Sequence, residues 1–160
     1  MTMRAFKGFG SLKTPMDLLQ EIRYDSGRLC DAPDNIYAAF DFFVTACHML
    51  DWLHPNDDKG RKDEETKCPL LQICSHLANG ANHFEATAKQ HTSVDDVVSE
   101  EGAFQPDALQ PSAFQVGGLF IRLDGQAASL FGAKTEAVDF AQKVLAHWEF
   151  DARLIKRSSQ

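Results

Sequence analysis

The residues best suited to chemistry form two polar stripes at helical spacing. One stripe lies in residues 70–84, LLQICSHLANGANHF, and its members are Gln72, His76, Asn79 and His83. The other lies in residues 36–53, and its members are Asp41, Thr45, His48 and Trp52. If the two stripes face each other, a carboxylate and three imidazoles share one groove.

Such a groove suits three kinds of chemistry. Neutral imidazole and carboxylate groups bind transition metals. A histidine that titrates near neutral pH can act as a general acid or base. A polar helix face can also pack against a second copy of the chain.

The acid–base alternative gives each candidate residue a role. His83 is the acid or base, Asn79 positions the substrate, and Asp41 or Asp51 orients the imidazole. His48 is the third candidate catalytic residue. The candidate ligand-binding residues are Asp41, Asp51, His76 and Gln72. The sequence contains no HExxH or ExxH motif, so no metal ligands are assigned, and no motif identifies a cofactor.

Two apolar faces are predicted to position these stripes. Residues 36–53 carry a broad apolar face, which predicts a central helix contacted by more than one neighbour. The main stripe of that face is Ile36, Phe40, Phe43, Cys47 and Leu50. The buried face of residues 70–84 is predicted to be Leu70, Ile73, Cys74, Leu77, Ala81 and Phe84.

Local signals place the other elements of the first half. Thr14 followed by Pro15 predicts the start of a first helix. Asp34 is predicted to cap the helix over residues 36–53. Residues 56–67, NDDKGRKDEETK, are almost wholly charged and are predicted to form a solvated, mobile loop.

The second half changes character at a region rich in Gly, Pro and Phe. The pattern of residues 119–124 predicts a strand, and residues 94–98 are predicted to pair with it. Asp124-Gly125 is predicted to form a turn. A short helical turn is expected over residues 127–131. Thr135 and Glu136 are predicted to open a final helix over residues 137–154.

These elements predict one mainly α domain spanning residues 1–160. The expected architecture is a bundle of three to four helices with a small β-hairpin before the C-terminal helix. Residues 1–13 are expected to form a flexible arm, residues 14–86 a helical core, and residues 87–160 the hairpin and the C-terminal helix.

Composition excludes several classes of function. The net charge of −7 argues against general nucleic-acid binding, which needs clustered Lys and Arg. No apolar run is long enough to span a membrane. Four irregularly spaced cysteines and no secretory signal predict a cytoplasmic protein without structural disulfides.

Two segments resemble known families. YAAFDFFVTACHMLDW at residues 37–52 and HLANGANHF at residues 76–84 are similar to a family of uncharacterised bacterial proteins. Asn79 and His83 on a late helix also resemble the HEPN superfamily, whose members include ribonucleases of toxin–antitoxin and antiviral systems and inactive partners. The signature of that superfamily is Arg-Asn-x-x-x-His. Here Ala78 stands in the Arg position, and residues 70–84 contain no Arg to hold a scissile phosphate.

The sequence therefore favours a binding protein over an enzyme. Acidic charge, the missing Arg and the absence of a complete catalytic motif predict a small module that binds a protein partner or its own copy. His48, Asn79 and His83 are expected to line the contact or a small ligand site. The alternatives are a HEPN-like ribonuclease or nucleotide-directed enzyme of a toxin or defence system, and a metal-binding helical bundle.

Overall fold

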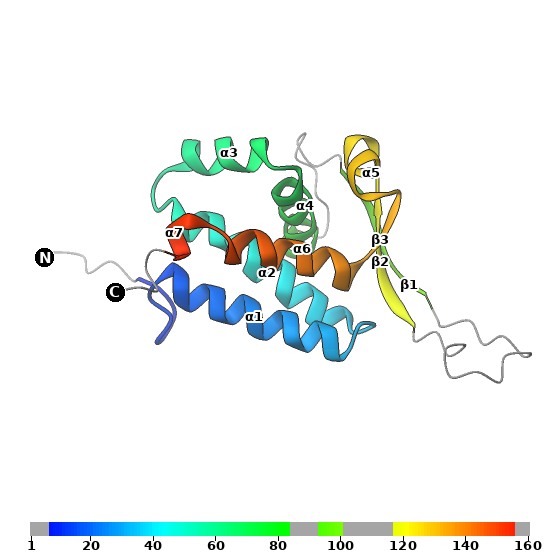
Figure 1. Cartoon of the computed structure of the whole chain (residues 1–160), viewed down its shortest axis with the longest axis horizontal. Helices are drawn as coiled ribbons and strands as arrows, with labels where there is room; N and C mark the ends of the chain where they lie inside the picture. The colour runs from blue at the N-terminus through cyan, green and yellow to red at the C-terminus, as the bar shows by residue number, and fades with distance from the viewer. Residues whose placement is uncertain (1–6, 84–92, 101–116, 156–160) are drawn as a thin grey trace, which may run out of the picture.

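The computed structural model describes residues 7–83, 93–100 and 117–155, and for residues 81–83 it describes the backbone (Figure 1). Within these ranges lie seven helices and a three-stranded antiparallel sheet. The predicted class, mainly α with a small β element, is confirmed in this broad form.

The first helix, α1 (Pro15–Asp31), begins where its sequence predicts. The Thr14 hydroxyl accepts a hydrogen bond from the Asp17 N–H at 3.2 Å, and the Asp17 carboxylate accepts one from the Thr14 N–H at 2.8 Å. This capping box satisfies amide groups that would otherwise lack a partner at the helix start. The helix packs against α2 (Ile36–Leu53) and α6 (Ala137–Glu149).

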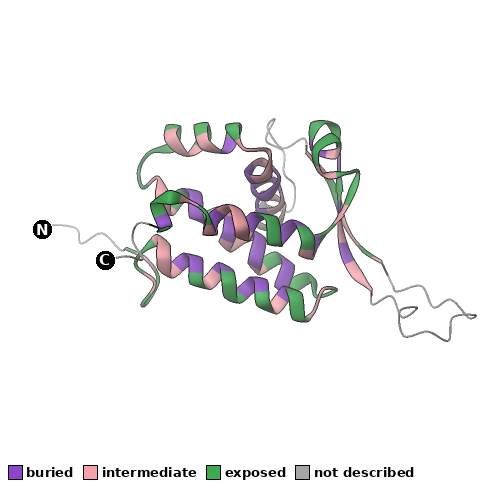
Figure 2. Cartoon of the chain, viewed as in Figure 1, coloured by how far each residue is buried: buried purple, intermediate pink, exposed green. Residues whose placement is uncertain are grey.

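The central position predicted for α2 is confirmed, because α1, α3 (Asp58–Lys67), α4 (Pro69–His83) and α6 all contact it. Buried residues concentrate on α2 and on the sides of α1 and α6 that turn toward it (Figure 2). The buried residues of α2 are Ala38, Ala39, Phe42, Phe43, Ala46, Met49 and Leu50.

Two predictions about the start of α2 are wrong. The cap is Asn35 rather than Asp34, because Asn35 directly precedes the first helical residue and its side-chain oxygen reaches the amides of Tyr37 and Ala38. Ile36 and Phe40, predicted to be core residues, are 48% and 46% exposed. The neighbouring helices bury the opposite side of α2, and its first turns lie beside an open groove instead.

The segment predicted to be a loop forms the helix α3. The Asp57 carboxylate accepts a hydrogen bond from the Gly60 N–H at 2.9 Å and caps the helix. Asp58 in the first turn and Lys67 in the last complement the helix dipole. Lys, Glu and Arg are also good helix formers, so a charged segment without an apolar period can still be helical.

The helix α4 begins at Pro69, one residue before the segment 70–84 that was predicted to be helical. Its buried face is broader than the predicted stripe and consists of Leu71, Ile73, Cys74, Ser75, His76 and Ala78. Leu70 and Leu77 are only partly buried. The difference arises because α2, α3 and the sheet each contact a different side of α4.

The predicted pairing of two strands is confirmed. β1 (Val94–Glu100) and β2 (Gly118–Leu123) are antiparallel, with Val97 opposite Ile121, and the register shifts between Val94 and Asp96. A third strand, β3 (Lys134–Glu136), joins the other edge of β2 and contains Thr135, which was predicted to open a helix. β1 and β3 are therefore the edges of the sheet.

The last helices also differ from the prediction. The predicted turn at Asp124-Gly125 is the start of α5 (Gly125–Phe131), which ends at Gly132 as expected. The predicted final helix is divided into α6 and α7 (Ala152–Ile155). The division occurs because the Asp151 carboxylate accepts a hydrogen bond from the Arg153 N–H at 2.8 Å and starts a new turn.

Candidate functional site

The polar stripe of α2 faces α1 over its first half. The Arg28 guanidinium donates to the Asp41 carboxylate at 2.8 Å and to the Asp25 carboxylate at 3.2 Å, and the Thr45 hydroxyl donates to Asp25 at 3.0 Å. Burial raises the pKa of Asp25, although the hydrogen bonds from Thr45 and Arg28 oppose that shift. Asp41, a candidate ligand residue, therefore joins two helices.

The second half of the same stripe reaches a different surface. His48 is exposed and lines a groove of about 580 Å³, together with Thr45 and Trp52 of α2. The other walls of this groove belong to α1 and to the segment that precedes it, where Phe9 and Leu12 pair in a tight turn. Asp51, one turn further along α2, lies 3.4 Å from the Arg61 guanidinium of α3.

The members of the polar stripe of α4 also face different surfaces. Gln72 donates to the carbonyl oxygen of Thr66 at 2.6 Å, and Asn79 donates to the carbonyl oxygen of Ser75 at 2.9 Å. Both amides line a polar groove of about 500 Å³ between α3 and α4, where Arg61 is a further wall residue. The amide nitrogen of Asn79 is thus bonded to its own helix.

His76 turns toward the sheet instead. Its side chain is buried, at 9% exposure, and its Nδ1 accepts a hydrogen bond from the Val94 N–H at 3.0 Å. The Ser93 hydroxyl lies 3.5 Å from the same nitrogen. Because Nδ1 accepts a hydrogen bond, it carries no proton in this arrangement.

Apart from Asp41, the members of the two stripes whose side chains are described line three separate grooves. His48 lies in the first, Gln72 and Asn79 in the second, and His76 in the third. The side chain of His83 lies outside the described part of the chain, so its proximity to His48 stays a prediction.

The third groove is the most apolar of the three. It has a volume of about 380 Å³ and is enclosed by α2, α4 and β1. Its lining residues are Ile36, Ala39, Phe40, Phe43, His76, Leu77, Gly80, Val94, Asp95, Asp96 and Val97. Ile36 and Phe40 form one wall with about half of each side chain exposed, and Tyr37, next to them in the sequence, is 76% exposed.

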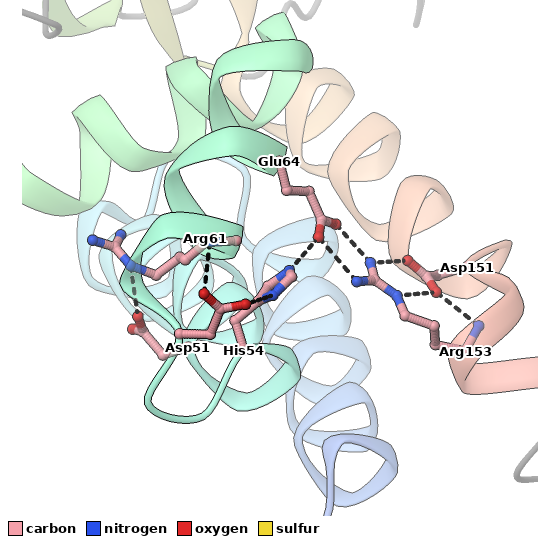
Figure 3. A network of polar contacts seen from close by, with 8 residues as sticks. Asp51, His54, Arg61, Glu64, Asp151 and Arg153 are labelled. Atoms are coloured by element: carbon pink, nitrogen blue, oxygen red, sulfur yellow. Dashed lines mark hydrogen bonds and ion pairs between the residues drawn. The ribbon is translucent and has the colours of Figure 1, made fainter.

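A network of charges attaches α3 to the rest of the protein (Figure 3). The Arg153 guanidinium donates two hydrogen bonds to Glu64, at 2.6 and 2.9 Å, and also pairs with Asp151. His54 Nε2 lies 2.5 Å from Glu64 Oε2, the oxygen that also accepts a hydrogen bond from Arg153 Nη1. The hydrogen bonds from Arg153 hold the pKa of Glu64 below its usual value. This network links α3 to α7 and to the end of α2.

Two of the four cysteines, Cys47 and Cys74, are poor nucleophiles in this environment. Burial raises the pKa of the Cys47 thiol to about 11 and raises that of Cys74 well above its usual value. A thiol that stays protonated at neutral pH neither attacks substrates nor binds metals readily. Among the side chains of residues 7–80, 93–100 and 117–155, no three His, Cys, Asp or Glu cluster in a way that could hold a metal ion.

Sequence reasoning missed the exposure of Ile36, Tyr37 and Phe40. One signal was available: the apolar residues of α2 occupy most of its circumference, and three or four neighbours rarely cover a whole helix. The pairs that join distant segments, such as Glu64 with Arg153, have no local signal at all.

No protein-family model, curated protein or solved structure matches this chain. Among the helices that the structure describes, none has the length and apolar character needed to cross a membrane.

Proposed function

We propose that this protein is a non-enzymatic binding module that docks a protein partner in the groove between α2, α4 and β1, which we call the α2–α4–β1 groove. One observation carries the proposal: Ile36 and Phe40 leave about half of each side chain in solvent beside a groove floored by Phe43. Exposed apolar patches of this kind are characteristic of interaction surfaces.

The shape of the patch favours a macromolecule over a small ligand. Tyr37, 76% exposed, extends the apolar surface from the wall of the groove onto the outer side of α2. A small molecule inside the groove would leave Tyr37 uncovered. A protein partner can cover both areas, and buried aromatic residues often dominate the energy of such contacts.

The candidate polar residues have structural partners that support a binding role. Asp41 pairs with Arg28, Asn79 donates to the backbone of α4, and His76 accepts from β1. We therefore propose that the partner contacts the apolar α2–α4–β1 groove rather than the predicted His/Asn/Asp groove. His76 belongs to both, because it also lines the apolar groove.

Photo-crosslinking tests the proposal. The photoreactive residue p-benzoylphenylalanine is placed at Phe40 or, as a matched control, at Phe150, which is 80% exposed at the end of α6. In the native host, the Phe40 variant should give a defined protein adduct, identified by mass spectrometry, that the Phe150 variant does not give. No adduct, or the same adducts from both positions, would contradict docking at the groove.

An enzymatic role has its own test. The ribonuclease alternative assigns His83 as acid or base and Asn79 as its positioning residue. Incubation with mixed RNA should show no cleavage if the protein is a binding module. Cleavage that is abolished by His83→Ala, at unchanged thermal stability, would replace the proposal.

A further inference from the structure

We infer that the α2–α4–β1 groove receives a cationic amphipathic helix from its protein partner, an inference that rests on the proposed docking function. Three features of the groove lead to this partner: the state of the β1 edge, the position of the apolar side chains, and the charge of the rim.

The β1 edge is poorly suited to adding a strand. The Leu123 N–H donates to the carbonyl oxygen of Ala133, on the side of β2 that faces β3. Val94 lies opposite Leu123, so the backbone N–H and C=O groups of Val94 point away from β2. Val97 lies opposite Ile121, which is two residues from Leu123 on β2, so the Val97 backbone also points away from β2; the register shift between Val94 and Asp96 brings these two residues, three apart on β1, to the same side. Ser99, opposite Leu119, points outward as well, but Val94 and Val97 are the two that line the groove, so a strand entering the groove would have to pair with their N–H groups.

Both of those N–H groups already have side-chain acceptors. The Val94 N–H donates to His76 Nδ1 at 3.0 Å, and the Val97 N–H donates to the Asp96 carboxylate at 2.8 Å. Side chains that occupy an edge in this way block strand addition. A partner helix needs no such pairing, because its backbone hydrogen bonds are internal.

The apolar side chains are placed to meet a helix. Ile36 and Phe40 lie one helical turn apart on α2, and Leu77 faces them from α4. A Cβ atom added at Gly80 would meet no atom of the described residues within 4 Å, so among these residues this side of the groove is open. Apolar residues at i, i+3, i+4 and i+7 of a partner helix fit a groove with two apolar walls.

The rim of the groove is acidic. Asp95 and Asp96 on β1 are both exposed, and exposed Asp34 precedes Ile36 by two residues. None of the described residues that line the groove is Lys or Arg, and the whole chain carries −7. A symmetric contact between two copies would bring acidic rims together, so the charge favours a foreign partner with Lys or Arg beside its apolar face.

Three labelled peptides of about 20 residues, long enough to form helices on binding, test this inference. The first has Leu at i, i+3, i+4 and i+7 and Lys elsewhere, the second has Glu in place of Lys, and the third alternates Leu and Lys as a strand does. Fluorescence anisotropy measures affinity, and amide chemical shifts locate binding. The first peptide should bind at the groove about tenfold or more tightly than the others, which corresponds to about 1.4 kcal/mol.

Charge-neutral variants sharpen the test. Asp95→Asn with Asp96→Asn should weaken binding of the Lys helix severalfold, and Asn can still accept the hydrogen bond from the Val97 N–H. The matched control Asp63→Asn, exposed on α3, should leave the affinity unchanged.

The outcomes separate the inference from the proposed function. If the Glu peptide or the alternating peptide binds the groove more tightly, the partner chemistry is wrong but docking at the groove stands. If sedimentation shows a dimer that Phe40→Asp dissociates, the occupant is a second copy, and the inference fails while a binding function remains. If no peptide shifts the amides of the groove, both proposals are overturned.

Discussion

The consecutive helices α2 and α3 are held in place by different forces. Phe42, Ala46 and Met49 of α2 are completely buried among apolar neighbours. The sequence of α3, DKGRKDEETK, contains no large apolar side chain, and its one buried residue is Glu65. Its attachment depends on ion pairs, chiefly that between Glu64 and Arg153.

The two attachments differ in how strongly they depend on salt and pH. Burial of apolar surface responds little to salt or pH, whereas ion pairs weaken when salt screens them or when a carboxylate is protonated. The structure therefore predicts a permanent core around α2 and a more labile α3. The first turns of α2 differ from both regions, because their apolar side chains are exposed, and we propose that a partner covers them.

The largest expected effect is on the core. Phe42→Ala removes a fully buried ring that packs edge-on against Phe43, with ring centroids 5.2 Å apart. The free energy of unfolding should fall by about 3–5 kcal/mol in chemical denaturation. Tyr37→Ala, at an exposed position on the same helix, is the control and should change it by less than about 0.5 kcal/mol. Equal losses in the two variants would contradict the placement of α2.

The next effect concerns the attachment of α3. Arg153→Gln removes both hydrogen bonds to Glu64, and because these groups are partly exposed the global cost should be about 1 kcal/mol or less. Hydrogen exchange should nevertheless accelerate across α3 and stay unchanged across α2. Arg23→Gln, which breaks the exposed pair with Glu149, is the control and should leave α3 protected. Faster exchange in both helices would show that α3 is not held separately.

A smaller effect should appear in acid. Hydrogen bonds from Arg153 lower the pKa of Glu64 and of Asp151, so each carboxylate binds protons more weakly in the folded chain than in the unfolded chain. Their stabilisation is present above the unfolded pKa values of about 4.3 and 3.9, and it is lost as the pH falls through the folded values. The difference in melting temperature between the wild type and Arg153→Gln should therefore shrink from pH 7 to about pH 3. A constant difference would mean that charge pairing is not its cause.

The predictable parts of the fold were those with local signals. Thr14 and Pro15 mark the start of α1, the apolar period marks α2 and α4, and the alternating strand at Leu119 marks β2. A cap or a period is read within a few residues, so no tertiary information is needed.

The parts that could not be predicted depend on contacts between distant segments. The attachment of α3 depends partly on Arg153, which is 89 positions away from Glu64. His76 occupies the predicted polar stripe, but its burial requires β1 to lie beside α4. The exposure of Phe40 could not be read from α2 alone, because an apolar residue looks the same in the sequence whether a neighbour covers it or not.

The central claim is that Ile36 and Phe40 serve binding rather than folding. The most direct measurement is the affinity of the Leu/Lys helical peptide for the double variant Ile36→Ser, Phe40→Ser. We predict a loss of about tenfold or more in affinity, as expected for anchor residues, with a free energy of unfolding within about 1 kcal/mol of the wild type. An unchanged affinity, or unfolding as severe as that of Phe42→Ala, would contradict the account.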